Sequence, residues 1–350
     1  MDNKNPPQNL SGIDHRRVLQ GAALAATGPL VQNAVAATPE PASTTLKARA
    51  VNFQPVMHDN KACTSKIKSV IESAARDGVD LIVFPEMALQ GFEKCQACAD
   101  RGSACDEHLL TGELADGPLM RELAGVVKRH NMYAVIGFGE RDPVKPLIYN
   151  ASAMLGPEGL IGTSRKMGVA SGMREAHTQS MFSPGDAITV FPTRYGPIGV
   201  GICYDMWMNP EVARIMVLKG ARILAIPTAT VATTMTGDIE RMAFTRAREN
   251  VVFVINANLV RGGFDGHVEG EPKYYSHSYI AGPQYPSMAR ILGRTDDPFG
   301  VVTADIDLAQ YDRFQSFRKF RERRSATGFD GHISQVVARE YAAYIVKTVS

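Results

Sequence analysis

The chain is organised around the stretch Gly196-Pro-Ile-Gly-Val-Gly-Ile-Cys-Tyr-Asp-Met-Trp-Met-Asn-Pro-Glu-Val-Ala-Arg214. Its first half is short and apolar, as in a buried strand. Asn209, Pro210 and Glu211 then resemble a helix start, with a capping residue, an N-terminal proline and an acid in the first turn. Cys203 is therefore predicted to lie at a strand-to-helix elbow, where free backbone N–H groups favour a thiolate and stabilise an oxyanion. A lone cysteine in an apolar strand is more often a buried structural residue, so other parts of the sequence must decide.

Composition narrows the class of protein and of partner. The chain has 350 residues, 45% hydrophobic and 21% charged, which allows one large domain or two small ones with a sizeable core. The formal net charge is +2 and there is no basic tract, so we expect small neutral substrates rather than nucleic acid. No uninterrupted apolar run of about twenty residues occurs, so we expect no membrane span in the mature protein.

Residues 1–37 are predicted to be a targeting segment, followed by a linker over residues 38–45. Arg16 and Arg17 precede a mildly apolar run from 21 to 37 that ends with the small-residue cleavage pattern Ala34-Val-Ala36. This arrangement resembles a twin-arginine signal, although Asp14 stands where that motif usually has Ser or Thr. We therefore expect the twin-arginine export machinery to deliver the folded protein to the periplasm. The alternative is a disordered tail that happens to contain two arginines.

The first regular segments predict an α/β fold. Residues 48–54 alternate like a strand, 61–77 carry apolar residues at helical spacing, and 79–84 form a continuous apolar strand, which together make a β-α-β unit. Glu86 follows that strand directly, so we expect its carboxylate at the sheet edge where open α/β sheets keep their active sites. Taken alone, Glu86 is as well explained as a cap of the next segment.

Residues 91–118 are predicted to be a long loop, because glycines interrupt every periodic pattern there. Cys95, Cys98 and Cys105 lie within this loop and indicate either a metal site or a disulfide. A zinc site would need a fourth ligand such as His108, and the spacing matches no common zinc motif. In an oxidising compartment a disulfide is the favoured interpretation. Cys63 is left as an unassigned thiol or a further partner, and the pairing of the four cysteines cannot be read from the sequence.

Lys166 ends a predicted hairpin. Residues 147–155 and 160–166 are strand-like, and Pro157-Glu158-Gly159 supplies the turn. A lysine at a strand end is commonly a solvated edge residue, so Lys166 alone carries little weight. Beyond it, strands are predicted near 188–191, 221–227, 251–256, 276–280 and 300–306, with helices over 210–219 and 238–250. The order of strands, helices and hairpins therefore repeats on either side of the middle.

Glu86, Lys166 and Cys203 are predicted to meet at one edge of this sheet system, although they are 80 (166 − 86) and 37 (203 − 166) positions apart. Together they make a hydrolytic set. The cysteine is the nucleophile, the carboxylate takes its proton and later activates water, and the lysine ammonium faces the negative charge that develops on a carbonyl oxygen. This chemistry yields a thioester intermediate and requires no metal or cofactor.

Three short motifs carry a resemblance to the nitrilase, or carbon–nitrogen hydrolase, superfamily: Phe84-Pro85-Glu86, Ser164-Arg165-Lys166 and Gly201-Ile-Cys-Tyr-Asp205. The likeness covers about residues 46–325, which leaves 326–350 as a C-terminal extension. It also includes Tyr149-Asn150, Phe182-Ser183-Pro184-Gly185, Arg246-Ala247-Arg248-Glu249-Asn250 and Arg323-Arg324.

The resemblance implies a four-layer α-β-β-α sandwich and assembly as homodimers or larger homo-oligomers. It also implies a catalytic Glu-Lys-Cys set, with the Lys166 ammonium and the Tyr204 backbone N–H as the oxyanion site. In the family a second glutamate helps to position the substrate and the lysine, and Glu175 is the matching candidate. The sequence departs from the common Lys-x-His-Leu pattern, because Met167, Gly168 and Val169 follow Lys166.

The residues after the cysteine bear on the substrate. Family members that act on nitriles usually carry Cys-Trp-Glu, whereas amidases and carbamoyl-amide hydrolases more often carry Cys-x-Asp, as Cys203-Tyr204-Asp205 does. The resemblance therefore favours hydrolysis of a small linear amide or N-carbamoyl compound. A nitrilase and a catalytically inactive binding protein are the alternatives. The branch that acylates lipoproteins has flanking membrane spans, and their absence here argues against that branch.

Overall fold

The computed structural model describes residues 44–92, 95–169, 180–230, 238–260, 277–295, 297, 299–314 and 336–343. The predicted signal segment and Glu175 lie outside these residues. Among the described helices, none is both long enough and apolar enough to cross a membrane.

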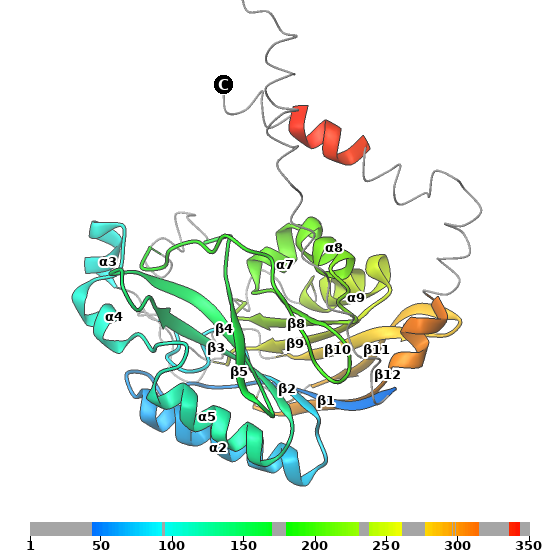
Figure 1. Ribbon diagram of the computed structural model, residues 1–350, viewed down its shortest axis with the longest axis horizontal. Coiled ribbons are helices and arrows are strands. Elements are labelled where there is room, and N and C mark those ends of the chain that lie inside the picture. The colour runs from blue at the N-terminus through cyan, green and yellow to red at the C-terminus, as the bar shows by residue number, and fades with distance from the viewer. Residues whose placement is uncertain are drawn as a thin grey trace, which may run out of the picture. The chain divides into compact units, whose positions relative to one another are not determined.

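Two six-stranded sheets form the centre of the fold (Figure 1). In the first, the strand order is β12-β1-β2-β3-β4-β5, and in the second it is β11-β10-β9-β8-β7-β6. The strands of the first sheet are β1 (Thr45–Val51), β2 (Leu81–Val83), β3 (Tyr133–Arg141), β4 (Ile148–Gly156), β5 (Gly159–Arg165) and β12 (Val301–Asp307). Those of the second sheet are β6 (Val190–Phe191), β7 (Ile198–Val200), β8 (Ile223–Thr228), β9 (Phe253–Asn258), β10 (Tyr279–Gln284) and β11 (Ser287–Arg294).

The two sheets have the same internal plan. Each has three parallel strands at its centre, β1, β2 and β3 in one and β7, β8 and β9 in the other, with antiparallel strands on both sides. The central strands β2 and β8 are buried along their whole length, which explains why they are continuous apolar runs rather than alternating ones. The sequence predicts that the order of elements repeats on either side of the middle, and the two sheets of the same plan confirm this.

Helices cover the outer face of each sheet, and Figure 1 shows the four layers. On the first sheet lie α2 (Asn60–Arg76) and α5 (Pro118–Arg129), whose apolar faces share one core with β2, β3 and β4. On the second lie α7 (Tyr204–Met208), α8 (Pro210–Leu218) and α9 (Asp238–Asn250), which share another core with β8, β9 and β10. A third core fills the space between the sheets. The predicted α-β-β-α sandwich is confirmed.

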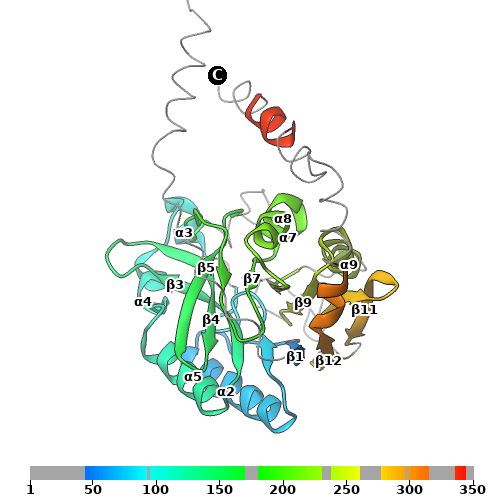
Figure 2. The same cartoon turned by 45° about the vertical axis from the view of Figure 1, so that its right-hand side comes forward.

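The elbow after β7 differs in detail from the prediction. Helix α8 begins at Pro210 as expected, but the side chain of Asn209 makes no capping hydrogen bond. A separate short helix, α7, begins directly after Cys203, which is its N-cap residue. Figure 2 shows α7 and α8 side by side next to β7. The helix that follows the cysteine at the elbow is therefore α7 and not α8.

The segment predicted as a long loop contains two short helices, α3 (Gln96–Arg101) and α4 (Asp106–Thr111). The prediction of an irregular loop was wrong, because six-residue helices are too short to show a periodic apolar face. Gly102 adopts a left-handed conformation at φ 65° and ends α3, so this glycine closes a helix rather than interrupting a loop.

Candidate active site

Cys203 occupies a strained backbone position. Its φ of 44° and ψ of −109° lie outside the regions that L-residues ordinarily adopt. Hydrogen bonds on both sides hold this conformation: the Cys203 N–H donates to the Pro227 carbonyl at 2.9 Å, and the Cys203 carbonyl accepts from Met206 at 2.9 Å and Trp207 at 3.1 Å. The chain thus turns sharply between β7 and α7, with Cys203 half-buried at the turn.

Glu86 follows β2 and is 1% exposed. Its backbone passes so close to β3 that a Cβ on Gly137 would lie 2.2 Å from the Pro85 carbonyl oxygen and 2.8 Å from the Glu86 Cα. Any side chain at 137 would push this segment away, so Gly137 sets the position of the carboxylate. The next residue, Met87, has a positive φ of 54° and turns the chain away from the sheet.

Lys166 follows β5 and is 2% exposed, and its Nζ donates to Glu86 Oε1 at 2.8 Å. The same carboxylate oxygen accepts a hydrogen bond from Asn150 Nδ2 on β4 at 2.7 Å. The Lys166 backbone is held as well, because its N–H donates to the Asn150 carbonyl and its own carbonyl accepts from the Gly185 N–H, both at 2.8 Å. Asn150 therefore fixes both members of the ion pair.

The electrostatic environment keeps Lys166 charged and Cys203 neutral. Burial disfavours the ammonium most strongly, but the negative groups around it, Glu86 first among them, together outweigh burial and raise the pKa of Lys166. Removal from water, followed by the nearby Glu86 charge, raises the pKa of Cys203, and Lys166 opposes this shift. The nucleophile is thus a protonated thiol with the Glu86 carboxylate nearby as its proton acceptor.

Asp205 was not assigned a role by the sequence analysis, yet it links the cysteine elbow to the lysine strand. Its carboxylate is 3% exposed and accepts hydrogen bonds from the Met167 N–H at 2.9 Å and the Gly168 N–H at 2.6 Å. Burial raises the pKa of Asp205, while these two bonds lower it. Gly168 fits this contact because a Cβ there would lie 2.9 Å from the Asp205 carboxylate and 3.2 Å from the Tyr204 ring.

The predicted oxyanion donor is the backbone N–H of Tyr204, the first residue of α7. Within the part of the chain that the structure describes, no residue accepts a hydrogen bond from this N–H. It lies next to Cys203, so a carbonyl carbon bonded to the sulfur would bring its oxygen near the N–H. The structure thus provides a donor here, on the residue that the sequence analysis named.

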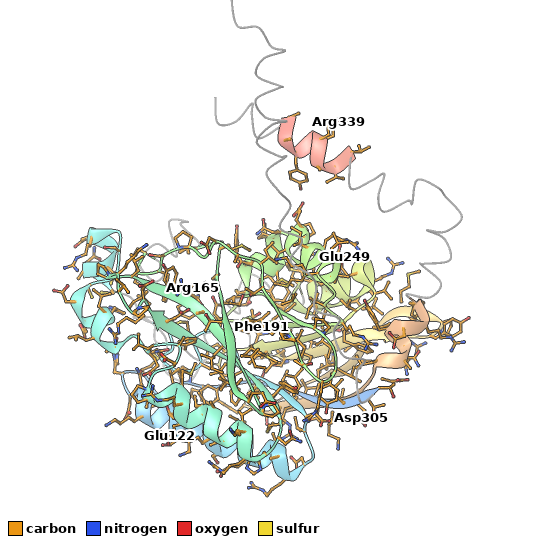
Figure 3. The ribbon with its side chains drawn as sticks, viewed as in Figure 1. Glu122, Arg165, Phe191, Glu249, Asp305 and Arg339 are labelled. Atoms are coloured by element: carbon orange, nitrogen blue, oxygen red, sulfur yellow. The ribbon has the colours of Figure 1, made fainter. Side chains whose placement is uncertain are left out.

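Arg165, labelled in Figure 3, braces the strand that carries Lys166. Its guanidinium makes two hydrogen bonds to Glu140, at 2.9 and 2.7 Å, and lies 3.7 Å from the centre of the Tyr149 ring. This bidentate geometry and ring stacking require arginine rather than lysine. The family-like Ser164-Arg165-Lys166 motif therefore has a physical basis, since Ser164 Oγ also donates to the Val200 carbonyl of the other sheet at 2.8 Å.

Arg246 on α9 holds the C-terminal end of α7, the helix that begins after Cys203. It is buried and donates to the carbonyls of Met206 at 2.7 Å and Trp207 at 3.0 Å, while Glu249, labelled in Figure 3, accepts from it at 2.9 Å. These carbonyls belong to a helix too short to satisfy them internally. The sequence motif that contains Arg246 thus holds α7 in place.

The cysteines outside the elbow do not form the disulfide that the sequence analysis favoured. All five cysteines are free thiols. The Sγ atoms of Cys95 and Cys105 are 3.7 Å apart, whereas a disulfide requires about 2.05 Å. Cys95, Cys98 and Cys105 instead converge with His108. Cys63 is not part of this group, because its thiol exchanges hydrogen bonds with the backbone of Val56.

The structure therefore brings Glu86, Lys166 and Cys203 together as predicted, and adds Asn150 and Asp205 to the site. Glu175 lies outside the described residues. The catalytic role of each residue remains a prediction that follows from this geometry.

Comparison with known proteins gives the family. The carbon-nitrogen hydrolase family model matches residues 47–315. Similar relatives include a protein named nitrilase from Pyrococcus abyssi, 29% identical over 80% of this chain and 97% of its own length, and a citrullinase from Francisella tularensis, 30% identical over 76% and 92%. An N-carbamoylputrescine amidase from Arabidopsis thaliana is 28% identical over 75% of this chain and 90% of its own.

Solved structures share the fold. A carbon-nitrogen hydrolase from Helicobacter pylori superposes with a TM-score of 0.63 at 20% identity, covering 79% of this chain and 94% of its own. An amidase of the nitrilase superfamily from Nesterenkonia superposes with a TM-score of 0.60 at 20% identity, covering 79% and 97%. The family match spans most of the chain and agrees with the two-sheet architecture, so the chain belongs to the carbon-nitrogen hydrolase family of the nitrilase superfamily.

Proposed function

We propose that this hydrolase cleaves the C–N bond of a small linear amide or N-carbamoyl compound and releases an acid and ammonia or an amine. One observation carries the proposal. The buried Glu86 carboxylate contacts the Lys166 ammonium at 2.8 Å, and it is close enough to Cys203 for its charge to raise the pKa of the thiol. A nucleophile, a base and a cation therefore meet at one point, as attack on a carbonyl carbon requires.

The first half of the reaction forms a thioester. The Cys203 sulfur bonds to the carbonyl carbon while its proton passes to Glu86. The carbonyl oxygen becomes an oxyanion, which the Lys166 ammonium and the Tyr204 N–H stabilise. The intermediate then collapses, the C–N bond breaks, and the leaving nitrogen takes the proton from Glu86. Because the pKa of Lys166 is raised, its ammonium keeps its charge throughout and acts by electrostatic attraction rather than as an acid.

The second half hydrolyses the thioester. Glu86 accepts a proton from water as the water oxygen attacks the thioester carbon, and the same two donors stabilise the second oxyanion. When the C–S bond breaks, the proton returns to the sulfur and the acid leaves. Glu175, matched to the family's second glutamate through the resemblance, is proposed to help position the substrate and Lys166.

The preference for amides and carbamoyl compounds rests on two kinds of support. The first is the Cys203-Tyr204-Asp205 sequence, which resembles the Cys-x-Asp pattern of amidases rather than the Cys-Trp-Glu pattern of nitrilases. Among the relatives, the names citrullinase, omega-amidase and N-carbamoylputrescine amidase describe proteins that act on such groups. The relative named nitrilase keeps a nitrile substrate as the second candidate.

Ammonia release tests the proposal. The mature protein, beginning near Thr38, is supplied with aliphatic amides, N-carbamoyl amino acids and the matching nitriles, beside Cys203→Ala and the control Cys63→Ser, which removes a buried thiol away from the site. We expect the wild type and Cys63→Ser to release ammonia from an amide or carbamoyl compound, and Cys203→Ala to release none. Release from nitriles alone would identify a nitrilase, and no release from any compound would favour a non-catalytic binding protein.

We also propose that the protein is exported in its folded state by the twin-arginine machinery to the periplasm and assembles as a homodimer or larger homo-oligomer. Export is supported by Arg16 and Arg17 before a weakly apolar run. Assembly is supported by the family resemblance, and light scattering of the purified protein measures it directly.

A further inference from the structure

A second group of reactive side chains lies in the segment that contains α3 and α4. Cys95 is the N-cap residue of α3 and Cys98 lies three residues later, while Cys105 is the N-cap residue of α4 and His108 again lies three residues later. The N-cap residue and the third residue of each helix therefore supply one pair of side chains per helix. One ligand-type atom from each of the four residues lies within 4.8 Å of all the others.

Three of the six distances between ligand atoms are close to those around a single tetrahedral ion, and all six are within 4.8 Å. Zinc binds sulfur at about 2.3 Å and imidazole nitrogen at about 2.0–2.1 Å, so ligand atoms at tetrahedral angles lie about 3.8 Å apart for two sulfurs and about 3.6 Å for sulfur and nitrogen. Here the sulfurs of Cys95 and Cys105 are 3.7 Å apart, and His108 Nδ1 lies 3.5 Å from the Cys98 sulfur and 3.1 Å from the Cys105 sulfur. An iron–sulfur cluster would hold its ligands farther apart, because several metal and sulfide atoms lie between them.

The surroundings match those of a bound thiolate site. Backbone N–H groups donate to two of the sulfurs, from Cys98 to Cys95 at 3.3 Å and from Cys105 to Cys98 at 3.2 Å. Such outer hydrogen bonds orient thiolate ligands and offset their charge. The Arg101 guanidinium donates to the Ala104 carbonyl at 3.2 Å and pairs with the Asp106 carboxylate at 3.0 Å, so it ties the end of α3 to the start of α4 beside Cys105.

We propose that Cys95, Cys98, Cys105 and His108 bind one Zn²⁺ ion in a closed, structural site. Three thiolates and one imidazole are a recognised structural zinc set, and sulfur ligands exclude magnesium and calcium. Binding releases the three thiol protons to solvent and leaves the zinc oxidation state unchanged. A disulfide between Cys95 and Cys105 would account for the proximity of only those two residues. It would not explain why Cys98 and His108 lie at the same place.

The site connects to the rest of the fold through its apolar surroundings. Cys98 and Cys105 are buried in one cluster with Met87 and Phe182. Met87 is the neighbour of Glu86, so the zinc ion anchors the segment that packs behind the catalytic carboxylate. We therefore expect removal of the ion to loosen α3 and α4 and to lower the thermal stability of the whole chain.

Metal content of the full mature protein tests the proposal. After purification without chelators, elemental analysis is expected to find about one zinc per chain. Because losing even an outer partner lowers metal affinity about 10–100-fold, Cys98→Ser and His108→Ala are each expected to retain at least tenfold less zinc than the wild type after dialysis. Cys63→Ser is the matched control and is expected to retain all of it. Retention of zinc in both cluster variants would overturn the assignment of the ligands.

A second measurement does not depend on the folding of the cluster variants. The chain has five cysteines, so the Cys63→Ser/Cys203→Ala double variant keeps only the three of the cluster. We expect those three thiols to resist a thiol reagent until a chelator removes the ion, and Co²⁺ in place of zinc to give the visible bands of tetrahedral sulfur ligation. A metal-free protein with a Cys95–Cys105 disulfide, or stoichiometric iron instead of zinc, would overturn the proposal.

Discussion

Replacement of Lys166 by methionine separates the structural from the chemical contribution of the buried ion pair. Methionine fills nearly the same space but carries no charge, and Glu86 then remains as a buried carboxylate. At 2.8 Å the two charges attract by about 6 kcal/mol at an effective dielectric constant of about 20. Asn150 donates to Glu86 in the wild type and in the variant alike, so this hydrogen bond cancels in the comparison.

Burying the lysine also costs free energy of desolvation, which methionine does not incur, so the net loss of unfolding free energy is expected to be about 3–5 kcal/mol, the range for removing one partner of a buried pair. A second change, Glu86→Gln in the same chain, removes the orphaned charge. We expect Glu86→Gln/Lys166→Met to regain at least about 2 kcal/mol of stability relative to Lys166→Met alone, because no charge is then buried. Both variants are expected to be inactive, so stability recovers while catalysis does not.

Urea unfolding followed by fluorescence measures this directly. The chain has one tryptophan, Trp207, which is 5% exposed in α7 and so reports on the cysteine elbow. The wild type, both single variants and the double variant form a complete cycle. A double variant as unstable as Lys166→Met would refute the argument from buried charge, and ammonia release by Lys166→Met at the wild-type rate would refute the role of the ammonium.

Four further predictions follow from the geometry. Because Cys203 has a positive φ of 44°, Cys203→Gly is expected to be more stable than Cys203→Ala by about 1 kcal/mol, and the reverse order of melting temperatures would contradict the strain. Asp205→Asn turns one acceptor into a donor that faces a backbone N–H. We expect the resulting misplacement of Lys166 to lower kcat about 100-fold, and an unchanged kcat would contradict this role of Asp205. A free cysteine has a pKa of about 8.5, but since the pKa of Cys203 is raised, its alkylation by iodoacetamide is expected to show no inflection near pH 8.5; an inflection between pH 6 and 8.5 would indicate a pre-formed thiolate. Replacement of Arg16 and Arg17 by lysines is expected to leave the protein in the cytoplasm, and folded protein in the periplasm would count against twin-arginine export.

Much of the site could be predicted from the sequence because each main residue lies within three positions of the end of a strand. Glu86 and Lys166 come after β2 and β5 of the first sheet and Cys203 after β7 of the second, and active sites of α/β sheets lie at such strand ends. The two sheets could be anticipated from the repeated order of elements. Asn150 and Asp205 were not assigned roles because their contacts depend on strand register and on the exact turn after Cys203, which no local pattern reveals.

The segment that contains α3 and α4 could not be predicted correctly from local sequence patterns. Its two helices have six residues each, too few for an amphipathic period, and glycines at 102 and 112 made the whole segment resemble a loop. The spacing of its cysteines matches no common zinc motif, so a disulfide was favoured. Only the folded chain shows that the N-cap and third residues of both helices point to one place.

The most direct test of the central claim is the mass of the peptide that contains Cys203, measured after rapid quenching of the enzyme during turnover of an amide. The account predicts an acyl group bound to that sulfur in the wild type, no adduct in Cys203→Ala, and a much slower appearance of the adduct in Glu86→Gln. Steady ammonia release without any adduct, and its persistence in Cys203→Ala, would contradict a thioester mechanism at this site.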